Sequence, residues 1–515
     1  MKFNFNTPNS LNWAMFIIVL LAFAWFYNFH EILFFGPQSA HFWRQTDCLS
    51  FTLNYMQEGR GLLNPTIHYI GRAGNGEVVS DFPILFYFIG QIWQITGQQE
   101  WIFRLIVFLI FAASLSTVFW VLKHYVKNTF LAIGIPMLLF TSPVIAYYSL
   151  NFVMNIVSFS LALIGLSFFY WFYKSGKTRL LWLSAVFYLL GGLIKIPALM
   201  SFVIIVFIYL SEVSGIIKYK REKAIFYKKI AHALPLLIVV VLVTAWVAFV
   251  SFYNKGNEGL YLVGIYPIWY LNMNEIRVIV DLFFDFWYAQ HFHRSLHIAT
   301  FIMLGWIFFN FKSLKAIEKV FVVLFPFGVI MFLLIWFKAM PEHDYYLTNT
   351  YGLFVLVWAI SVKLLIDKFN KTLQVRIIQL LFSALLIFNA FHCRDELYSR
   401  YNYWWNNQYR SFYEPIKELK PLLKEKGIQR TDTIVSIGDY TPNATLYLLD
   451  MKGWSNFGGH MSNTDSASIS KSIQSGAKYM VVIDTSQLNE DYLKPYTNNL
   501  LIEYKSLKVY DLLEE

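Results

Sequence analysis

Long apolar runs separated by short charged segments make up most of the first 400 residues. A helix that crosses a bilayer needs about 17–25 mostly apolar residues. Runs close to this length lie at 13–27, 101–122, 129–148, 156–173, 180–194, 197–213, 232–252, 296–311, 319–337, 346–362 and 377–392. No small-residue cleavage site follows the first run, so it is expected to be retained as a helix. The pattern predicts an α-helical polytopic membrane protein with about 11 spans.

Two apolar stretches depart from a simple span. The stretch 180–210 is too short for two full-thickness helices, and Gly191, Lys195 and Pro197 interrupt its centre. It is predicted to form two short helices that meet at a break. The stretch 82–95 is shorter than a span, and we expect it to lie along the membrane surface or to re-enter the membrane.

Clusters of Lys and Arg fall in alternate connections between the apolar runs. They lie at 123–127, 174–179, 218–229, 312–319 and 363–376. Placing all of them in the cytoplasm satisfies the positive-inside rule. The outer side then receives the loops 30–100 and 253–295, the short connection 338–346 and everything after about Arg394. The loop 253–295 is rich in aromatic residues, which predicts further helices at the membrane interface.

The C-terminal part, 401–515, has the composition of a water-soluble domain. The segment IKELKPLLKEK (416–426) is predicted to be an amphipathic helix. Strands are predicted for TIVSIG (433–438), TLYLLD (445–450), KYMVVID (478–484), LLIEYKS (500–506) and LKVYDL (507–512). The sequence therefore predicts a transmembrane domain over 1–400, followed by a small α/β domain on the outer side.

Composition agrees with lipid as the main solvent. The 515 residues are 57% hydrophobic and 14% charged, whereas soluble domains average about 25% charged residues. The net charge of +10 resides in the short clusters between apolar runs. It is therefore interpreted as a topology signal and as contact with anionic lipid, not with nucleic acid. Only two cysteines occur, which excludes a disulfide framework and a thiolate metal site.

The segment HFWRQTD (41–47) follows the first predicted span. An enzyme that acts on a lipid phosphate needs a cation near the phosphate and a carboxylate near the acceptor hydroxyl. Arg44 and Asp47 are three residues apart, so a helix would place them on one face. The alternative is an interfacial belt in which Trp43 anchors the segment and Arg44 only pairs with Asp47.

Two further polar segments open helices on the outer side. Asp81 lies two residues before Pro83. Taken alone it favours the N-cap of the following helix, but a cap does not exclude a site residue, so it is also a candidate second acid. Tyr148 and Asn155 lie in SPVIAYYSLNFVMN (142–155) and bring polar groups to an outer helix end. An interfacial tyrosine belt explains the latter segment equally well.

Other candidates bear on phosphate and metal binding. Lys195 lies inside a membrane segment, which costs roughly 2.5–3.5 kcal/mol at a helix centre, so it needs an anion or water. It is either a phosphate ligand or a lysine that snorkels to the interface. His343, Tyr345 and Tyr346 lie in PEHDYY (341–346), a candidate donor-binding segment or a polar loop with a helix cap. His293 is a weak candidate metal ligand, as is Asp81.

These segments together resemble glycosyltransferase family 39 of the GT-C class, which uses polyprenyl-phosphate donors. The matching residues are His41, Trp43, Arg44, Gln45 and Asp47; Asp81 and Pro83; Gly97 and Arg104; Ser142, Pro143, Tyr147 and Tyr148; Gly192, Lys195 and Pro197; and His343, Tyr345 and Tyr346. They occur in the family's order over roughly residues 1–360. The group includes protein O-mannosyltransferases and lipid A aminoarabinose transferases.

The resemblance implies a transferase of the bacterial plasma membrane that acts on the outer side in cell-envelope glycan synthesis. It implies that Asp47 is the catalytic carboxylate, and that Arg44 and Lys195 stabilise the departing lipid phosphate. The family often has an Asp where Asn155 stands here, so the role of a second acid passes to Asp81. Because an early-loop acid helps to bind metal in aminoarabinose transferases, a divalent ion is left open as a cofactor.

Two other functions are compatible with the same residues. A transporter or flippase would use Lys195 and the broken helix as a substrate path, and it would show inverted repeats, of which the sequence has none. A glycan polymerase or ligase would need the same phosphate and base chemistry as a single-sugar transferase. The identities of the sugar and of the acceptor (lipid, glycan or protein) are not encoded in a recognisable motif.

Overall fold

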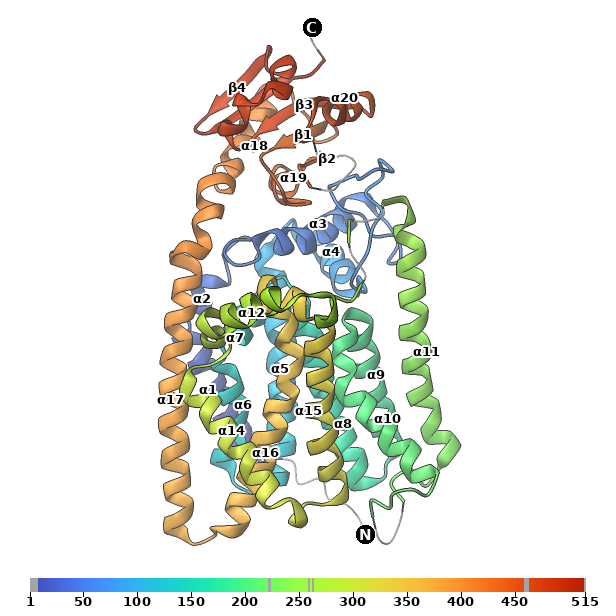
Figure 1. The fold of residues 1–515 in the computed structure, drawn as a ribbon, viewed down its shortest axis with the longest axis vertical. Coiled ribbons are helices and arrows are strands. Elements are labelled where there is room, and N and C mark those ends of the chain that lie inside the picture. The colour runs from blue at the N-terminus through green and yellow to red at the C-terminus, as the bar shows by residue number, and fades with distance from the viewer. Residues whose placement is uncertain (1–7, 221–223, 258–259, 262–263, 458–462, 514–515) are drawn as a thin grey trace. The chain divides into compact units, whose positions relative to one another are not determined.

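The structure is a computed structural model that describes residues 8–220, 224–257, 260–261, 264–457 and 463–513 (Figure 1). Its contacts divide the chain into two units. The first unit comprises 1–34, 104–246 and 265–397. The second comprises 35–103, 247–264 and 398–515, so it joins two long loops to the C-terminal region.

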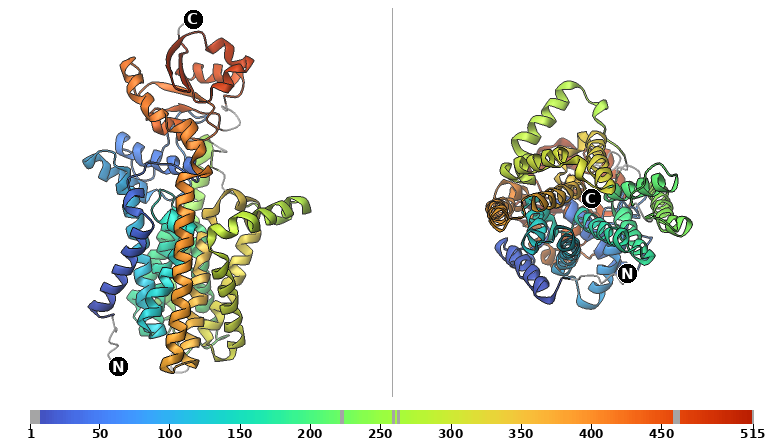
Figure 2. Two further views of the ribbon diagram at one scale, coloured as in Figure 1. Left: turned by 90° about the vertical axis from the view of Figure 1, so that its left-hand side faces the viewer. Right: turned by 90° about the horizontal axis from the view of Figure 1, so that it is seen from below.

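The first unit is a bundle of helices (Figure 2). Its α-helices are α1 (Ser10–Phe26), α2 (Phe29–Ile32), α5 (Glu100–Val126), α6 (Thr129–Phe140), α7 (Pro143–Ser149), α8 (Asn155–Ser175), α9 (Thr178–Ile194), α10 (Met200–Val213), α11 (Lys229–Tyr253), α12 (Met273–Leu282), α13 (Tyr288–His291), α14 (Arg294–Phe309), α15 (Ala316–Ile335), α16 (Tyr351–Lys368) and α17 (Thr372–Asn402). Helices α5, α11 and α17 end or begin in the second unit. Helix α8 packs on α9, and α15 packs on α10 and α16.

The predicted spans coincide with helices. Over the described residues, seven helices are long and apolar enough to cross a membrane, or up to nine if each of two bent pairs is one span. The bent pairs are α6 with α7, at 83°, and Met273–His291 with α14, at 91°. The shorter apolar helices α1 and α9 account for two further predicted spans. The prediction of a multi-pass α-helical membrane protein is thus confirmed.

The predicted break in 180–210 is also confirmed. Helix α9 ends at Ile194, and Lys195 has extended backbone angles (φ −146°, ψ 119°). A short 3-10 turn, Ile196–Leu199, then leads into α10. Pro197 cannot donate a backbone hydrogen bond and disfavours helical geometry in the residues before it, which explains why the helix stops here.

The second unit contains the two helices of the first long loop and the C-terminal α/β region. Its helices are α3 (Phe42–Glu58), α4 (Ile84–Thr96), α18 (Ile416–Glu425), α19 (Ala444–Leu449) and α20 (Ser466–Gln474). The strands β1 (Thr433–Ile437), β2 (Gly453–Trp454), β3 (Ala477–Val482), β4 (Leu500–Tyr504) and β5 (Leu507–Asp511) form one sheet in the order β2-β1-β3-β5-β4. Strand β1 is parallel to β2 and β3, whereas β5 is antiparallel to β3 and β4.

One predicted strand is wrong. TLYLLD forms helix α19, in which every residue from Ala444 to Leu449 is buried. A short apolar run carries no periodicity that separates a buried helix from a buried strand. The helix ends at Asp450, whose φ of 56° is left-handed. The other four predicted strands and the amphipathic helix α18 are confirmed.

The first long loop extends this sheet. The amide of Gly453 donates to the carbonyl of His68 (3.1 Å), and the amide of Ile70 donates to the carbonyl of Gly453 (3.0 Å). The loop therefore covers the open edge of β2, which would otherwise present unpaired backbone groups. A Cβ atom at Gly453 would lie 1.8 Å from the carbonyl oxygen of Ile434, so only glycine fits between the two neighbours.

Candidate active site

Helix α3 brings the first pair of candidate residues together in the second unit. The guanidinium Nη1 of Arg44 donates to Oδ2 of Asp47 at 3.3 Å, as the three-residue spacing predicts. Asp47 is fully buried and Arg44 nearly so. A surface belt would leave both groups in water, so this pair is part of the interior of the unit.

Asp81 contacts the same guanidinium from the far end of the loop. Nη2 of Arg44 donates to Oδ2 of Asp81 at 2.9 Å and to the hydroxyl of Ser80 at 3.1 Å. The expectation that Asp81 caps the following helix is wrong, because Pro83 occupies the N-cap position of α4. An ion pair with a buried guanidinium binds the carboxylate more strongly than helix amides at an exposed terminus would.

Asn443 completes the cluster and was missed by sequence reasoning. Its side-chain amide donates to Oδ1 of Asp47 at 2.7 Å, and its carbonyl oxygen accepts from the backbone amide of Tyr69 at 3.0 Å. The residue is fully buried, at the start of α19. It is 396 positions from Asp47, and no local pattern marks one asparagine in a loop as the partner of a distant carboxylate.

Two acids of this cluster share one guanidinium. Arg44 lies 3.3 Å from a carboxylate oxygen of Asp47 and 2.9 Å from one of Asp81. Burial raises the pKa of Asp47 to about 6, although Arg44, Asn443 and Tyr261 each lower it. The ring of Tyr261 lies against the guanidinium, 5.3 Å from its carbon to the ring centroid.

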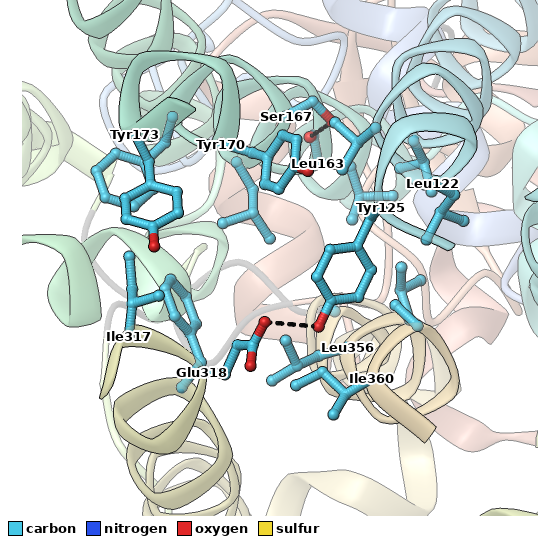
Figure 3. Close-up of a pocket in the computed structure, with 18 of the residues that line it drawn as sticks. Leu122, Tyr125, Leu163, Ser167, Tyr170, Tyr173, Ile317, Glu318, Leu356 and Ile360 are labelled. Carbon is cyan, nitrogen blue, oxygen red and sulfur yellow. Dashed lines mark hydrogen bonds between the residues drawn. The ribbon is translucent and has the colours of Figure 1, made fainter. Parts of the chain in front are cut away.

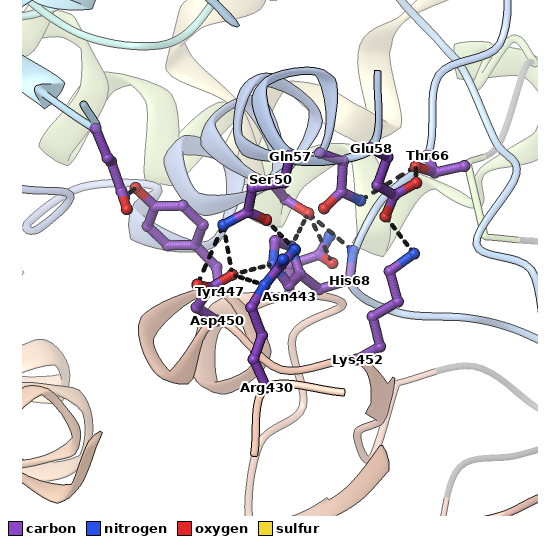
Figure 4. Close-up of polar contacts among 12 residues, drawn as sticks. Ser50, Gln57, Glu58, Thr66, His68, Arg430, Asn443, Tyr447, Asp450 and Lys452 are labelled. Atoms are coloured by element: carbon purple, nitrogen blue, oxygen red, sulfur yellow. Dashed lines mark hydrogen bonds and ion pairs between the residues drawn. The ribbon is translucent and has the colours of Figure 1, made fainter. Parts of the chain in front are cut away.

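A second polar network adjoins the first (Figure 4). The hydroxyl of Ser50 and Nδ1 of His68 are 2.7 Å apart, and Nε2 of His68 is 3.5 Å from Oδ1 of Asp450. Burial lowers the pKa of His68 against the opposing effect of Asp450, and the lowered pKa favours the neutral ring. Arg430 donates to the same oxygen of Asp450 at 3.0 Å. This network ties α3, the first loop and α19 together behind Asn443.

The bundle unit contains the remaining donor-site candidates. The hydroxyl of Tyr148 donates to Oδ1 of Asp344 at 2.6 Å, and both residues are buried. The hydroxyl of Tyr345 and Nδ1 of His343 are 3.1 Å apart. Rings from α7 and from the 3-10 segment Asp344–Thr350 meet edge to face, with 5.7 Å between the centroids of Tyr148 and Tyr345.

Three other predicted residues have separate surroundings. Tyr346 packs its ring on His343, at 4.8 Å between centroids. Asn155 is buried at the first position of α8. Lys195 is half-buried at the break between α9 and the turn that precedes α10.

Metal binding has little support from the described side chains. Among them, no group of three or more His, Cys, Asp or Glu residues could hold an ion. His293 is the N-cap of α14, where its Nδ1 accepts from the amide of Ser295 at 3.1 Å. Asp81 binds Arg44. The weakly predicted ligands therefore have structural partners, and we assign no step to a metal ion.

Solved structures place this arrangement among known folds. The chain is similar to ArnT from Cupriavidus metallidurans bound to undecaprenyl phosphate, with a TM-score of 0.60, 12% identity and 98% of each chain covered. The fold is that of a GT-C glycosyltransferase. Archaeal oligosaccharyltransferase AglB from Archaeoglobus fulgidus, in complex with an inhibitory peptide and a dolichol-phosphate, matches with a TM-score of 0.59 and 11% identity, over 93% of this chain and 70% of that one.

A third GT-C structure extends the comparison. Arabinofuranosyltransferase AftD from Mycobacteria has a TM-score of 0.55 and 11% identity, over 98% of this chain and 40% of its own. No family profile and no curated protein matches the sequence. The likeness to GT-C proteins thus rests on the three-dimensional fold. The order of short motifs in the sequence had indicated the same class.

Proposed function

We propose that this GT-C protein transfers a sugar from a polyprenyl-phosphate-linked donor to a hydroxyl group of an extracytoplasmic acceptor, which is a lipid, a glycan or a protein. The observation that carries the proposal is Asp47: a buried carboxylate with a pKa of about 6, hydrogen-bonded on both oxygens, beside a guanidinium that it shares with Asp81. Such a group can accept a proton near neutral pH.

Asp47 is the proposed general base. A base works best when its pKa lies near the operating pH, because it is then both ionised and basic enough to accept the proton. An exposed aspartate, with its pKa near 3.8, would be a far weaker base. Burial gives Asp47 the required basicity, although Arg44, Asn443 and Tyr261 oppose it.

Arg44 is the proposed link between donor and base. The guanidinium presents several donors in one plane, a geometry that binds phosphate as well as carboxylate. A donor phosphate would compete with Asp47 for it, and it would stabilise the negative charge left on the phosphate as the glycosidic bond breaks. Because Arg44 lowers the pKa of Asp47, drawing the guanidinium away would make the carboxylate more basic when the donor is bound.

Groups of the bundle unit are proposed to bind the donor. Tyr148 donates to Asp344, and Tyr345 contacts the half-buried His343, so this region presents hydrogen-bonding groups suited to a polar head group. We also propose contacts from Tyr346 and Asn155, and a charge contact from Lys195. We place the reaction on the outer side of the bacterial plasma membrane, where the C-terminal region would also lie, and the transferred sugar is a hexose or a pentose.

Donor class is the first test. Purified full-length protein would be incubated with undecaprenyl-phosphate-linked hexose, undecaprenyl-phosphate-linked pentose, a lipid-linked oligosaccharide and the matching nucleotide sugars, with envelope extract as acceptor. The oligosaccharide is included because the same fold occurs in an oligosaccharyltransferase. Release of the free lipid phosphate is expected only with a lipid-linked donor. Transfer from a nucleotide sugar alone would refute the proposal.

The Asp47→Asn variant tests the base. A positioned general base contributes typically about 10²–10⁴-fold, so turnover should fall at least roughly a hundredfold at equal amounts of folded protein. Asp432→Asn is the matched control, because this acid of the same unit pairs with Lys478 at 2.8 Å and accepts from the amide of Gln429, and in the described part of the chain it does not contact Asp47. If Asp47→Asn retained activity within a few-fold while Asp81→Asn lost it, the base would be reassigned to Asp81.

A further inference from the structure

A cavity of about 150 Å³ lies among four helices of the bundle unit and belongs to none of the groups described above (Figure 3). Helices α5, α8, α15 and α16 line it, almost wholly with apolar atoms. Tyr125, Tyr170 and Tyr173 add aromatic rings to its wall. An apolar cavity of this size is unfavourable for water and can hold part of an aliphatic chain.

Two lysines line the end of the cavity near the basic connections. Lys174 comes from the last turn of α8 and Lys315 from the residue before α15. Among the described residues, neither ammonium has an ion-pair partner within 4.0 Å; Lys174 lies over the rings of Tyr170 and Tyr173. Lys127 and Lys220 lie close enough to repel the charge of Lys174. The charge of this end is strongly positive.

The acid in the wall, Glu318, attracts Lys174, but among the described residues it forms no ion pair within 4.0 Å with Lys174 or Lys315. Glu318 accepts from the hydroxyl of Tyr125 at 2.9 Å through one oxygen. Its other oxygen accepts from the backbone amide of Lys315, also at 2.9 Å. Both carboxylate oxygens are thus used to hold α5 against the start of α15, and the two ammonium groups remain available to an external anion.

The position in the bundle separates this cavity from the proposed donor groups. Lys174 is 19 residues beyond Asn155 on α8, which at the helical rise is about 28 Å, close to the thickness of the bilayer hydrocarbon. Asn155 and Tyr148 therefore lie toward one end of the bundle and the lysines toward the other.

We propose that the cavity binds an anionic phospholipid. One acyl chain would enter between the four helices, and the phosphate would lie between Lys174 and Lys315. The aliphatic chain matches the apolar wall, and the single negative charge matches the paired ammonium groups. The lipid would join α5 and α8 to α15 and α16, which makes it a structural ligand distinct from a sugar donor.

Lipid retention by the intact protein tests the proposal. Full-length protein would be purified in detergent, exchanged into mixtures of phosphatidylglycerol and phosphatidylcholine, and examined by native mass spectrometry for retained lipid. Lys174→Ala/Lys315→Ala should lower the affinity for phosphatidylglycerol by about fivefold per lysine, hence roughly 25-fold for the pair. Lys312→Ala/Lys371→Ala is the matched control, because these exposed lysines lie in basic connections and do not line the cavity.

A second variant tests the acyl-chain site without changing charge. Ala359→Leu adds side-chain volume to the wall and should also reduce retained phosphatidylglycerol. Equal retention by wild type and by Lys174→Ala/Lys315→Ala would overturn the proposal, as would equal retention of the two phospholipids. Retention of undecaprenyl phosphate with no retention of phosphatidylglycerol would show that the occupant is a polyprenyl lipid instead, and would also overturn it.

Discussion

Replacing Asn443 by Leu removes an uncharged donor to Asp47 while keeping the branched shape of the side chain. The lost hydrogen bond is 2.7 Å long and goes to a buried carboxylate. Hydrogen bonds to charged groups contribute about 1.5–3 kcal/mol, and each pKa unit corresponds to about 1.4 kcal/mol. Because the Asn443 amide favours the ionised form, its loss should raise the pKa of Asp47 from about 6 to roughly 7–8.

This shift has a defined signature in the pH profile of transfer. A general base is active when ionised, so kcat/KM should rise with pH through the pKa of Asp47. At pH 6 about half of the wild-type carboxylate is ionised, against roughly 1–9% in Asn443→Leu, a deficit of about 5- to 50-fold. At pH 9 the two proteins should approach each other. The assay is release of lipid phosphate from a lipid-linked donor between pH 5 and 9.

A control variant separates the shift in the pH profile from a general loss of stability. Asn456 is another buried asparagine of the same unit, and its side chain accepts from the amide of Gly438 at 2.6 Å without touching Asp47. Asn456→Leu should lower the melting temperature without moving the acid limb. If Asn443→Leu lost activity by the same factor at every pH, Asn443 would only hold the structure, and the reasoning about Asp47 would be refuted.

Three further outcomes follow from the same contacts. The folded-state pKa of Asp47 is about 6 and exceeds its ordinary 3.8, so wild-type stability should fall by at most roughly 3 kcal/mol as pH rises from 4 to 7. Thermal melts of Asp47→Asn should lack this fall, and a parallel fall in the variant would contradict the raised pKa. The hydrogen bond from His68 and the charges of Lys420 and Arg430 lower the pKa of Asp450 to about 2, against the effect of burial. The stabilisation by Asp450 should therefore disappear as pH drops below about 4. At pH 7, Asp450→Asn should melt at a lower temperature than wild type, without a shift in the pH profile of transfer. Gly90→Val should lower the melting temperature in every buffer, because a Cβ there would lie 2.8 Å from Cβ of Tyr55 in α3. The control Gly97→Val meets no neighbour but has a φ of +77°, so it should show only backbone strain. Equal melting temperatures of Gly90→Val and wild type would exclude the close packing of α3 on α4.

Local sequence patterns were sufficient to predict most of the membrane-spanning helices. Lipid offers no hydrogen-bond partner to the backbone, so an apolar run of span length must satisfy its own backbone groups by forming a helix. The spans could therefore be located from composition alone. The break at Lys195 was predictable as well, since Gly191, Gly192 and Pro197 weaken the helix together over a few residues. The bends between α6 and α7 and before α14 were not predicted, because a bend depends on the helices packed against it.

Some contacts of the candidate site could be predicted from the sequence, whereas others depend on the tertiary structure. The pairing of Arg44 with Asp47 follows from a spacing of three on one helix, and the sequence by itself determined it. The approach of Asp81 and Asn443 depends on how the first loop folds onto the sheet, and of the two only Asp81 had been singled out, in part as a helix cap. The raised pKa of Asp47 could not be predicted either, since it arises from burial, which outweighs the opposing effects of Arg44, Asn443 and Tyr261. Burial and long-range proximity are properties of the tertiary structure, and no local pattern in a single sequence specifies them.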